Sequence, residues 1–210
     1  MRRFQRDRRR LVERLEARGI TDLAVLHAFD RIPRHLFVPA ELHLRAYEDE
    51  ALPIGFEQTI SRPSVHALHL MLAELEGHER VLEVGTGSGF QTALLAVLAA
   101  DVFSIERVRP LATLAARRLE LLGLHATIRI GDGSAGWPRE APFDVILLGA
   151  AAPSVPVALQ DQLAEGGRLI APVGDRQGQS LVRLRREKAA VQCERIRTAR
   201  FVPLVAGRSP

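Results

Sequence analysis

Two hydrophobic patterns alternate along most of the chain after residue 80. Short apolar runs predict strands that are buried on both faces, at residues 81–84, 101–105, 126–130, 143–148 and 168–172. Between them, helices are predicted at residues 90–99, which contain no glycine or proline, at residues 110–122, which end before Gly123, and at residues 157–163. Two closing antiparallel strands are predicted at residues 180–185 and 194–201. This alternation favours an α/β fold, a doubly wound and mostly parallel sheet with helices on both faces.

The first 76 residues follow a different pattern. Helices are predicted at residues 4–18 and 22–30. An extended segment, residues 52–61, leads into a helix over residues 64–75, with Ser61 or Arg62 near its N-cap. We therefore expect a single domain of residues 1–210. Residues 1–76 would form an N-terminal helical cap with an active-site loop, and residues 77–210 a ligand-binding core.

A glycine-rich turn follows the strand at residues 81–84. Glycine stands at positions 85, 87 and 89, which lets the backbone turn sharply and approach a ligand beyond the carboxyl ends of the strands. Dinucleotide-binding turns have the spacing G-x-G-x-x-G. This turn has G-x-G-x-G, and Glu83 precedes its first glycine by two positions. The alternative is a glycine turn that has only a packing role.

Composition narrows the class of protein. Apolar residues make up 47% of the chain, mean hydropathy is close to zero, and no apolar run reaches the ~20 residues of a membrane span. A soluble, cytoplasmic protein is expected. Cys193 is the only cysteine, so an intramolecular disulfide is excluded and a cysteine-based metal site is disfavoured. The net charge of +4 is modest, and glutamates are interspersed among the arginines, so charge alone does not favour nucleic-acid binding.

Two further acidic residues follow predicted strands. Glu106 comes about twenty residues after the first glycine of the turn, where open α/β nucleotide sites place the carboxylate that binds ribose hydroxyls. Asp132 stands between Gly131 and Gly133 at the end of the next strand, a position that also suits a plain turn. Ser61 likewise suits a plain helix N-cap on local sequence alone.

Several phrases occur in a fixed order along the chain. They are PRHLFVP (33–39), LPIGFEQTIS (52–61), VLEVGTGSGF (81–90), GAAAP (149–153) and FVPL (201–204). In this order they resemble the protein-L-isoaspartate O-methyltransferase family, which belongs to the class I S-adenosylmethionine-dependent methyltransferases. The resemblance runs from about residue 32 to residue 204. Ser64, Val205 and the pair Phe56-Glu57 depart from the commonest family pattern, which bears on peptide preference.

The resemblance implies a Rossmann-like fold and a reaction. A methyl group would pass from S-adenosylmethionine to the free carboxylate of L-isoaspartyl residues in damaged proteins and peptides, which initiates their repair and leaves S-adenosyl-L-homocysteine. The substrate carboxylate, with an ordinary pKa near ~4, is already ionised at pH 7, so no general base is needed. The resemblance implies that Ser61 is the catalytic residue and orients this carboxylate.

The resemblance also implies a set of cofactor-binding residues. They are Gln58, Thr59, Ile60, Ser61, His66, Glu83, Gly85, Gly87, Gly89, Glu106, Arg107, Asp132 and Gly133, with no metal ion. Glu83 would face the ammonium group of the cofactor, Glu106 its ribose, and Asp132 with the Gly133 N–H its adenine edge. Residues 58–60 would close over the cofactor. Trp137 and residues 150–153 would form a wall of the peptide groove.

Other functions stay open at this point. The arginine-rich N-terminus suggests a nucleic-acid methyltransferase, but residues 149–153 lack the N/D-P-P-Y/F element with an aromatic residue that stacks a flipped base. A carboxyl methyltransferase for one dedicated partner peptide is a second alternative, and a non-catalytic binding protein is a third. The main reading predicts isoaspartyl proteins and peptides as partners, no nucleic acid or membrane, and a monomer.

Overall fold

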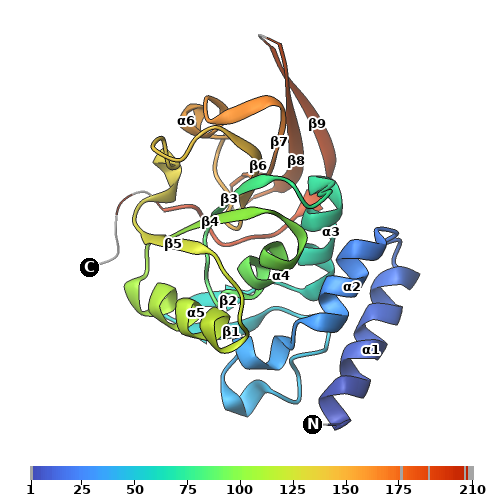
Figure 1. The fold of residues 1–210 in the computed structure, drawn as a ribbon. Helices are drawn as coiled ribbons and strands as arrows, with labels where there is room; N and C mark the ends of the chain where they lie inside the picture. The colour runs from blue at the N-terminus through green and yellow to red at the C-terminus, as the bar shows by residue number, and fades with distance from the viewer. Residues whose placement is uncertain (1, 176, 189, 206, 208–210) are drawn as a thin grey trace.

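The computed structural model describes residues 2–175, 177–188, 190–205 and 207, and within them seven strands form one central sheet (Figure 1). The sheet order is β5-β4-β3-β6-β7-β8-β9. The strands are β3 (Arg80–Val84), β4 (Asp101–Glu106), β5 (Thr127–Ile130), β6 (Phe143–Leu148), β7 (Leu163–Gly174), β8 (Gln179–Glu187) and β9 (Ala190–Ala199). Strands β3 to β7 run parallel, whereas β8 and β9 are antiparallel. The predicted mostly parallel sheet is therefore confirmed.

Helices cover both faces of the sheet. One face carries α3 (Pro63–Ala73), α4 (Phe90–Leu98) and α5 (Arg109–Leu121). The short helix α6 (Val157–Gln160) and the 3-10 turn η3 (Gly133–Ala135) cover the other face together with loops. Helices α1 (Arg2–Ala17) and α2 (Leu23–Arg31) lie outside α3 and α4 and form the helical cap (Figure 1). The doubly wound fold with a helical cap agrees with the sequence prediction.

The remaining cap elements are short. They are the 3-10 turns η1 (Arg34–Phe37) and η2 (Ala40–Leu42) and the antiparallel hairpin of β1 (Leu52–Gly55) and β2 (Gln58–Ile60). The predicted extended segment is thus a hairpin, because Phe56 and Glu57 both adopt positive φ and reverse the chain between the two strands. Strand β2 delivers the chain directly to the start of α3.

Alternate residues of the central strands face two separate hydrophobic cores. Val81, Val145 and Leu147 join the core beneath the cap and helices α3 to α5. Their neighbours Leu82 and Ile146 join the core on the opposite face. Because side chains alternate along a strand, burial on both faces requires the unbroken apolar runs that the sequence displays.

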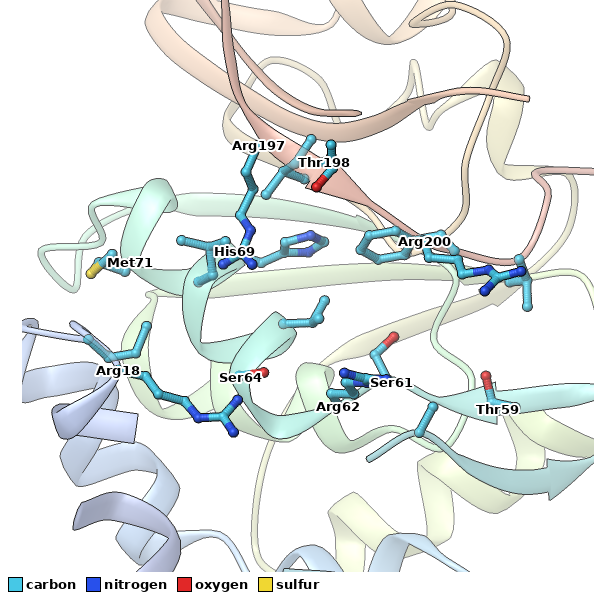
Figure 2. A pocket seen from close by; sticks show the side chains of 18 of the residues that line it. Arg18, Thr59, Ser61, Arg62, Ser64, His69, Met71, Arg197, Thr198 and Arg200 are labelled. Atoms are coloured by element: carbon cyan, nitrogen blue, oxygen red, sulfur yellow. The ribbon is translucent and has the colours of Figure 1, made fainter. Parts of the chain in front are cut away.

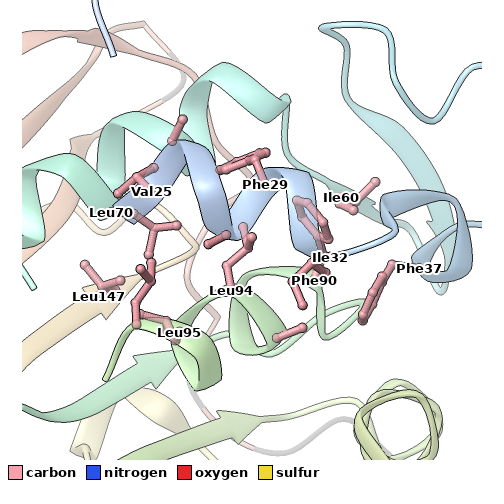
Figure 3. Packing of buried hydrophobic residues seen from close by; sticks show 14 of the residues in the cluster. Val25, Phe29, Ile32, Phe37, Ile60, Leu70, Phe90, Leu94, Leu95 and Leu147 are labelled. Atoms are coloured by element: carbon pink, nitrogen blue, oxygen red, sulfur yellow. The ribbon is translucent and has the colours of Figure 1, made fainter. Parts of the chain in front are cut away.

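Aromatic side chains join the cap to the core (Figure 3). The rings of Phe29 and Phe37 meet the ring of Phe90 at centroid distances of 5.7 and 5.5 Å, both in edge-to-face geometry. All three are almost fully buried. Each buried phenyl ring contributes about 1.5–3 kcal/mol through removal of apolar surface from water, so the cap is held on the first residue of α4, directly after the glycine turn.

Two boundary predictions were wrong. The last strand was expected over residues 194–201, but β9 begins at Ala190 and ends at Ala199, because its pairing with β8 continues to Glu187. A helix was expected over residues 157–163, but α6 ends at Gln160 and Leu163 already pairs with Phe143 as the first residue of β7. The next pair along the ladder is Val145 with Arg168, so residues 164–167 form an irregularity inside β7. The glycines at 166 and 167 serve this irregularity, which local sequence does not distinguish from a turn between two elements.

The described helices also bear on membrane insertion. Among the residues that the structure describes, no helix is both long enough and apolar enough to cross a membrane.

A substitution in the glycine turn tests its packing. Gly89 has a φ of +86°, and a Cβ added there would lie 2.9 Å from the Cβ of Ala115 in α5. We expect Gly89→Ala to lower the free energy of unfolding by about 2–4 kcal/mol, through left-handed backbone strain together with overpacking. The measurement is urea unfolding monitored by circular dichroism.

The control for Gly89→Ala is Gly77→Ala. Gly77 has a similar φ of +99°, but nothing lies within 4 Å of an added Cβ. This variant isolates the backbone strain, about 1–2 kcal/mol. Equal losses in the two variants would contradict a packing contribution from Ala115.

Candidate active site

The glycine turn lies where the order of the sheet reverses. Strand β3 has β4 on one side and β6 on the other, so a crevice opens beyond its carboxyl end. The Gly85 N–H donates to the carbonyl of Ile105 at 2.8 Å, and the Gly149 N–H donates to the carbonyl of Val84 at 2.8 Å. The ends of the three strands are thereby tied together, and the turn forms the floor of a cavity.

Glu83 places a buried carboxylate beneath this cavity. Its Oε2 accepts hydrogen bonds from the hydroxyls of Thr92 and Ser104, at 2.5 and 2.7 Å. Its Oε1 is buried and has no partner. Burial raises the pKa of Glu83 to about 7, against the smaller opposing effects of the Thr92 and Ser104 hydroxyls and of the Gln91 side chain. A buried carboxylate with one unused oxygen suits a cationic ligand group.

Glu106 supports the glycine turn from the end of β4. One carboxylate oxygen accepts the N–H of Gly87 at 2.8 Å, and the other accepts the N–H of Val108 at 2.9 Å. Each oxygen keeps a further lone pair, because a carboxylate offers about four acceptor sites. Glu106 is therefore held rigidly and can still accept hydrogen bonds from a ligand hydroxyl.

Asp132 lies at the end of the neighbouring strand, β5. Its Oδ1 accepts from the N–H and the hydroxyl of Ser134, and its Oδ2 accepts the N–H of Gly207 at 2.7 Å. Burial alone would raise the pKa of Asp132, but these hydrogen bonds and the nearby guanidinium of Arg107 lower it. Asp132 is thus an ionised acceptor, and the half-buried Arg107 lies close enough to influence its charge.

Gly133 follows Asp132 and packs closely against β3. An added Cβ at Gly133 would lie 2.4 Å from Cγ1 of Val84. No side chain fits here without displacing the end of β3. The backbone N–H of Gly133 is therefore kept close to the carboxyl end of the central strand.

Ser61 joins the hairpin to α3 and faces the same cavity. Ser61 lines the cavity together with Glu83, Gly85 and Gly87, although about twenty-five residues separate it from the glycine turn in sequence. The N-cap residue of α3 is Arg62, and no side chain caps the helix there. The hydroxyl of Ser61 is therefore not used as a helix cap, and the plain N-cap interpretation is wrong.

Other members of the predicted loop differ in position. Thr59 lines the cavity and is exposed, whereas Ile60 is buried in the core beneath the cap and also reaches the cavity. The Gln58 amide instead donates to the carbonyl of Phe56 at 3.3 Å within the hairpin turn, and its side chain does not line the cavity.

His66 lines the cavity one helical turn after Ser61. Its Nδ1 lies 3.0 Å from Oε1 of Gln91, and its ring meets Phe90 edge to face. Burial lowers the pKa of His66 to about 3, so the ring is neutral at pH 7. His66 is thus a buried residue of the site and not a residue of the helix surface.

His69 and Phe201 form one wall of the cavity, which the sequence did not predict. Their rings stack with centroids 5.3 Å apart, and both residues line the cavity beside Ser61. The segment after β9 is held in place because the Ala151 N–H donates to the carbonyl of Val202 and the Leu204 N–H donates to the carbonyl of Ala151. The phrase at residues 201–204 was noticed in the sequence, but its position against α3 depends on tertiary structure.

Arg34 was also missed as a residue that supports the site. Its side chain is fully buried, and it donates to the carbonyls of Ala46, Glu50 and Ser61 at 2.7, 3.3 and 3.1 Å. Its guanidinium lies 5.2 Å from the ring centroid of Phe90. Arg34 therefore fixes the backbone of Ser61 relative to the cap. The conspicuous signal was an arginine within the apolar segment at residues 32–39.

Trp137 does not form a wall of the groove. It is buried in the core on the opposite face of the sheet, where its ring meets that of Phe103 at 5.7 Å. Its backbone N–H donates to the side chain of Gln162 at 2.6 Å. A single tryptophan after a turn can line a groove or pack in a core, and Trp137 packs in the core. Of the loop after β6, Gly149 lines the cavity.

A parallel sheet with a glycine turn after β3 and a carboxylate after β4 is a nucleotide-binding arrangement, and solved structures place this chain among the class I S-adenosylmethionine-dependent methyltransferases. One of a protein-L-isoaspartate O-methyltransferase is 30% identical with a TM-score of 0.84, and the match covers 93% of this chain and 65% of that chain. One of a β-aspartate methyltransferase (PCMT) from Plasmodium falciparum, in complex with S-adenosyl-L-homocysteine, is 28% identical with a TM-score of 0.82, covering 94% and 98%.

Sequence comparison identifies the family within this class. Residues 6–209 match the family model described as Protein-L-isoaspartate(D-aspartate) O-methyltransferase (PCMT). The protein-L-isoaspartate O-methyltransferase of Trichlorobacter lovleyi is 49% identical, and the match covers 96% of this chain and 94% of that protein. The chain belongs to the protein-L-isoaspartate O-methyltransferase family, whose members are S-adenosylmethionine-dependent enzymes.

The buried carboxylate of Glu83 leads to a prediction about pH. Because its folded-state pKa of about 7 exceeds the ordinary 4.5, the folded protein holds this proton more tightly than the unfolded chain. This contribution to stability is full below about pH 4.5 and falls as the pH rises towards 7. We expect the free energy of unfolding of the wild type, relative to Glu83→Gln, to decrease over this window by up to ~3 kcal/mol. Urea unfolding at several pH values measures the difference.

The control for Glu83→Gln is Glu79→Gln. Glu79 is also almost fully buried, but its carboxylate accepts the backbone N–H groups of Glu76 and Gly77, which favour the ionised form. For Glu79→Gln, the difference in free energy of unfolding between wild type and variant should increase with pH instead of decreasing. A flat profile for Glu83→Gln would contradict a proton held on Glu83.

Proposed function

We propose that this protein transfers a methyl group from S-adenosylmethionine to the free carboxylate of L-isoaspartyl residues in damaged proteins and peptides, and so initiates their repair. The observation that carries the proposal is the position of the Ser61 hydroxyl. It faces the same cavity as the buried, half-satisfied carboxylate of Glu83 and the glycine turn. One cavity thus has a side for the methyl donor and a side for the acceptor. A monomer without a nucleic-acid partner is part of this proposal.

The residues at the strand ends fit S-adenosylmethionine, which supplies a methyl group carried on a positively charged sulfonium. The unpartnered Oε1 of Glu83 would accept a hydrogen bond from the ammonium group of the cofactor, directly or through water. Glu106 would accept from the ribose hydroxyls with its remaining lone pairs. Asp132 and the Gly133 N–H would take the adenine edge, beside Arg107. The Gly207 N–H donates to Oδ2 of Asp132, and this hydrogen bond would have to break for that oxygen to accept from adenine.

Ser61 would act by positioning the acceptor. Its hydroxyl would donate a hydrogen bond to the substrate carboxylate and hold one oxygen in line with the methyl group. Such orientation supplies up to ~7–11 kcal/mol in well-ordered systems. The site needs no proton acceptor, since the carboxylate is already ionised at pH 7. The neutral rings of His66 and His69 add no positive charge that would hold the carboxylate away from the methyl group.

The surroundings of Ser61 would also keep water out of the site. Ile60 is buried beneath the hairpin, and the stacked pair of His69 and Phe201 covers the other side. The opposite charges of carboxylate and sulfonium cancel as the methyl group moves. Water stabilises the separated charges more than the transition state, and a site with little water therefore favours transfer. Residues 58–60 would contribute to this closure.

The proposed reaction is tested with two matched peptides and radiolabelled S-adenosylmethionine. One peptide contains L-isoaspartate and the other normal aspartate at the same position. We expect base-labile label on the isoaspartyl peptide only, because only its carboxylate reaches the position set by Ser61. Label on RNA or DNA with neither peptide methylated would refute the proposal. Label on a single cellular protein without isoaspartate would favour a dedicated partner.

The role of Ser61 is tested by Ser61→Ala. Loss of the orienting hydrogen bond should lower kcat/KM for the isoaspartyl peptide by about 10²–10³-fold. The Kd for S-adenosyl-L-homocysteine should change less than about twofold, because the cofactor carboxylates and the glycine turn are unaltered. Calorimetry gives the Kd and the peptide assay gives kcat/KM.

Ser180→Ala is the control for Ser61→Ala. Ser180 is a serine of β8 that does not line the cavity, so the variant removes the same hydroxyl group elsewhere. Its kcat/KM should match the wild type. Full activity of Ser61→Ala would rule out the proposed positioning role.

A further inference from the structure

A large groove opens beside Ser61, on the side away from the glycine turn. Its volume is about 900 Å³, and it is bounded by the end of α1, by α3, by β9 and by the segment after β9 (Figure 2). It shares Thr59, Ser61, Val65 and His69 with the cavity above the glycine turn. The groove is therefore the space from which a peptide reaches Ser61.

Arginines dominate the charge of this groove. Arg18, Arg62, Arg197 and Arg200 line it, and no aspartate or glutamate among the described residues does so. Figure 2 shows these side chains around the groove, from three separate parts of the chain. His69 adds no charge at pH 7, because burial lowers its pKa to about 4. The positive charge is thus supplied by guanidinium groups, which do not titrate near neutral pH.

Three of the four arginines have no partner in the part of the chain that the structure describes. Arg18 forms an ion pair with Asp49. The exposed side chains of Arg62, Arg197 and Arg200 have neither a hydrogen bond nor an ion pair to any residue that the structure describes. These three guanidinium groups are available to a ligand.

Neighbouring arginines on the same sheet behave differently. Arg183 of β8 contacts Glu74 and Glu194 at 2.7 and 2.8 Å, and Arg185 contacts Glu74 at 2.5 Å. The half-buried Arg183 and Arg185 of β8 are thus matched by glutamates of this chain. Arg197, on the adjacent strand and facing the groove, is not. The groove thus contains positive charge that no described acidic residue matches, beside Ser61.

We infer that this groove selects isoaspartyl peptides that carry further carboxylates beside the damaged residue, an inference that rests on the proposed function. Guanidinium groups bind carboxylates through paired N–H donors, and Arg62, Arg197 and Arg200 surround the acceptor position set by Ser61. A groove of one charge also raises the local concentration of oppositely charged ligands. Peptides with lysine or arginine beside the isoaspartate are disfavoured for the same reason.

The test compares isoaspartyl peptides of equal length that differ only in the residues flanking the isoaspartate: glutamates, glutamines or lysines. Exposed ion pairs are individually weak, so several together should raise kcat/KM of the glutamate peptide about three- to tenfold over the glutamine peptide at low salt. The ratio should fall in about 0.5 M NaCl because salt screens exposed charges. The lysine peptide should be the poorest substrate.

Two double variants that remove the same charge distinguish the effect of the groove arginines from the effect of the protein's net charge. In Arg197→Gln/Arg200→Gln the preference for the glutamate peptide should fall towards one. Arg117→Gln/Arg139→Gln removes the same charge from exposed residues outside the groove and should keep the wild-type ratio. Equal kcat/KM for the glutamate and glutamine peptides, or an unchanged ratio in Arg197→Gln/Arg200→Gln, would overturn the inference.

A binding measurement distinguishes failure of this inference from failure of the proposed function. Fluorescence anisotropy with S-adenosyl-L-homocysteine present measures the Kd of labelled normal-aspartyl versions of the same peptides, which are not methylated. Tighter binding of the glutamate version that requires Arg197 and Arg200 supports the groove even if no peptide is methylated. Equal binding of all versions, or stronger competition by an oligonucleotide of the same charge, refutes the groove while leaving the reaction intact.

Discussion

The buried guanidinium of Arg34 is the interaction on which the arrangement of the site depends. It donates to the carbonyls of Ala46 and Glu50, in the segment before β1, and to the carbonyl of Ser61, after β2. Burial lowers the pKa of Arg34 to about 9, so the group stays charged at neutral pH. Hydrogen bonds to a charged donor contribute about 1.5–3 kcal/mol each. Without this donor the three carbonyls would lose a charged hydrogen-bond partner, and Ser61 would be held only through its neighbours, by the pairing of Ile60 with Leu52 and by the hydrogen bonds from Ser64 to Asp49.

The second constraint is the buried carboxylate of Glu83. Thr92 and Ser104 satisfy only one of its oxygens, and the other oxygen has no partner at the floor of the cavity. A protein that needed this position only for packing would be more stable with an apolar residue there. The unsatisfied oxygen therefore favours a role in binding a cationic ligand group. The raised pKa of Glu83 means that ionising this buried carboxyl lowers the free energy of unfolding.

The site also separates charge between its two sides. The core supplies the carboxylate of Glu83 to the cavity, and those of Glu106 and Asp132 lie at the ends of the neighbouring strands β4 and β5. Guanidinium groups line the groove on the other side of Ser61. A cationic methyl donor and an anionic acceptor would thus approach Ser61 from opposite sides, each along a surface of opposite charge. Ser61 itself is uncharged and favours neither side.

Much of the fold was predictable because its signals are local. Continuous apolar runs identify strands buried on both faces, and glycine at alternate positions identifies the turn at Gly85 and Gly89. The proximity of Glu83 and Glu106 to the glycine turn was predictable because the carboxyl ends of parallel strands meet at one edge of a sheet. The boundary of β7 was not predictable, because a pair of glycines suits both a turn and an irregularity inside a strand.

The sequence by itself therefore determined the sheet, the place of the glycine turn and, through family phrases, the nature of the reaction. Tertiary structure decided which side chains support and surround Ser61. Arg34 reaches it across 27 residues, and His69 stacks on Phe201 although the two lie on α3 and on the segment after β9. The arginines of the groove are likewise brought together from opposite ends of the chain. Such contacts leave no periodic pattern, since the pairing of distant residues depends on how the elements pack.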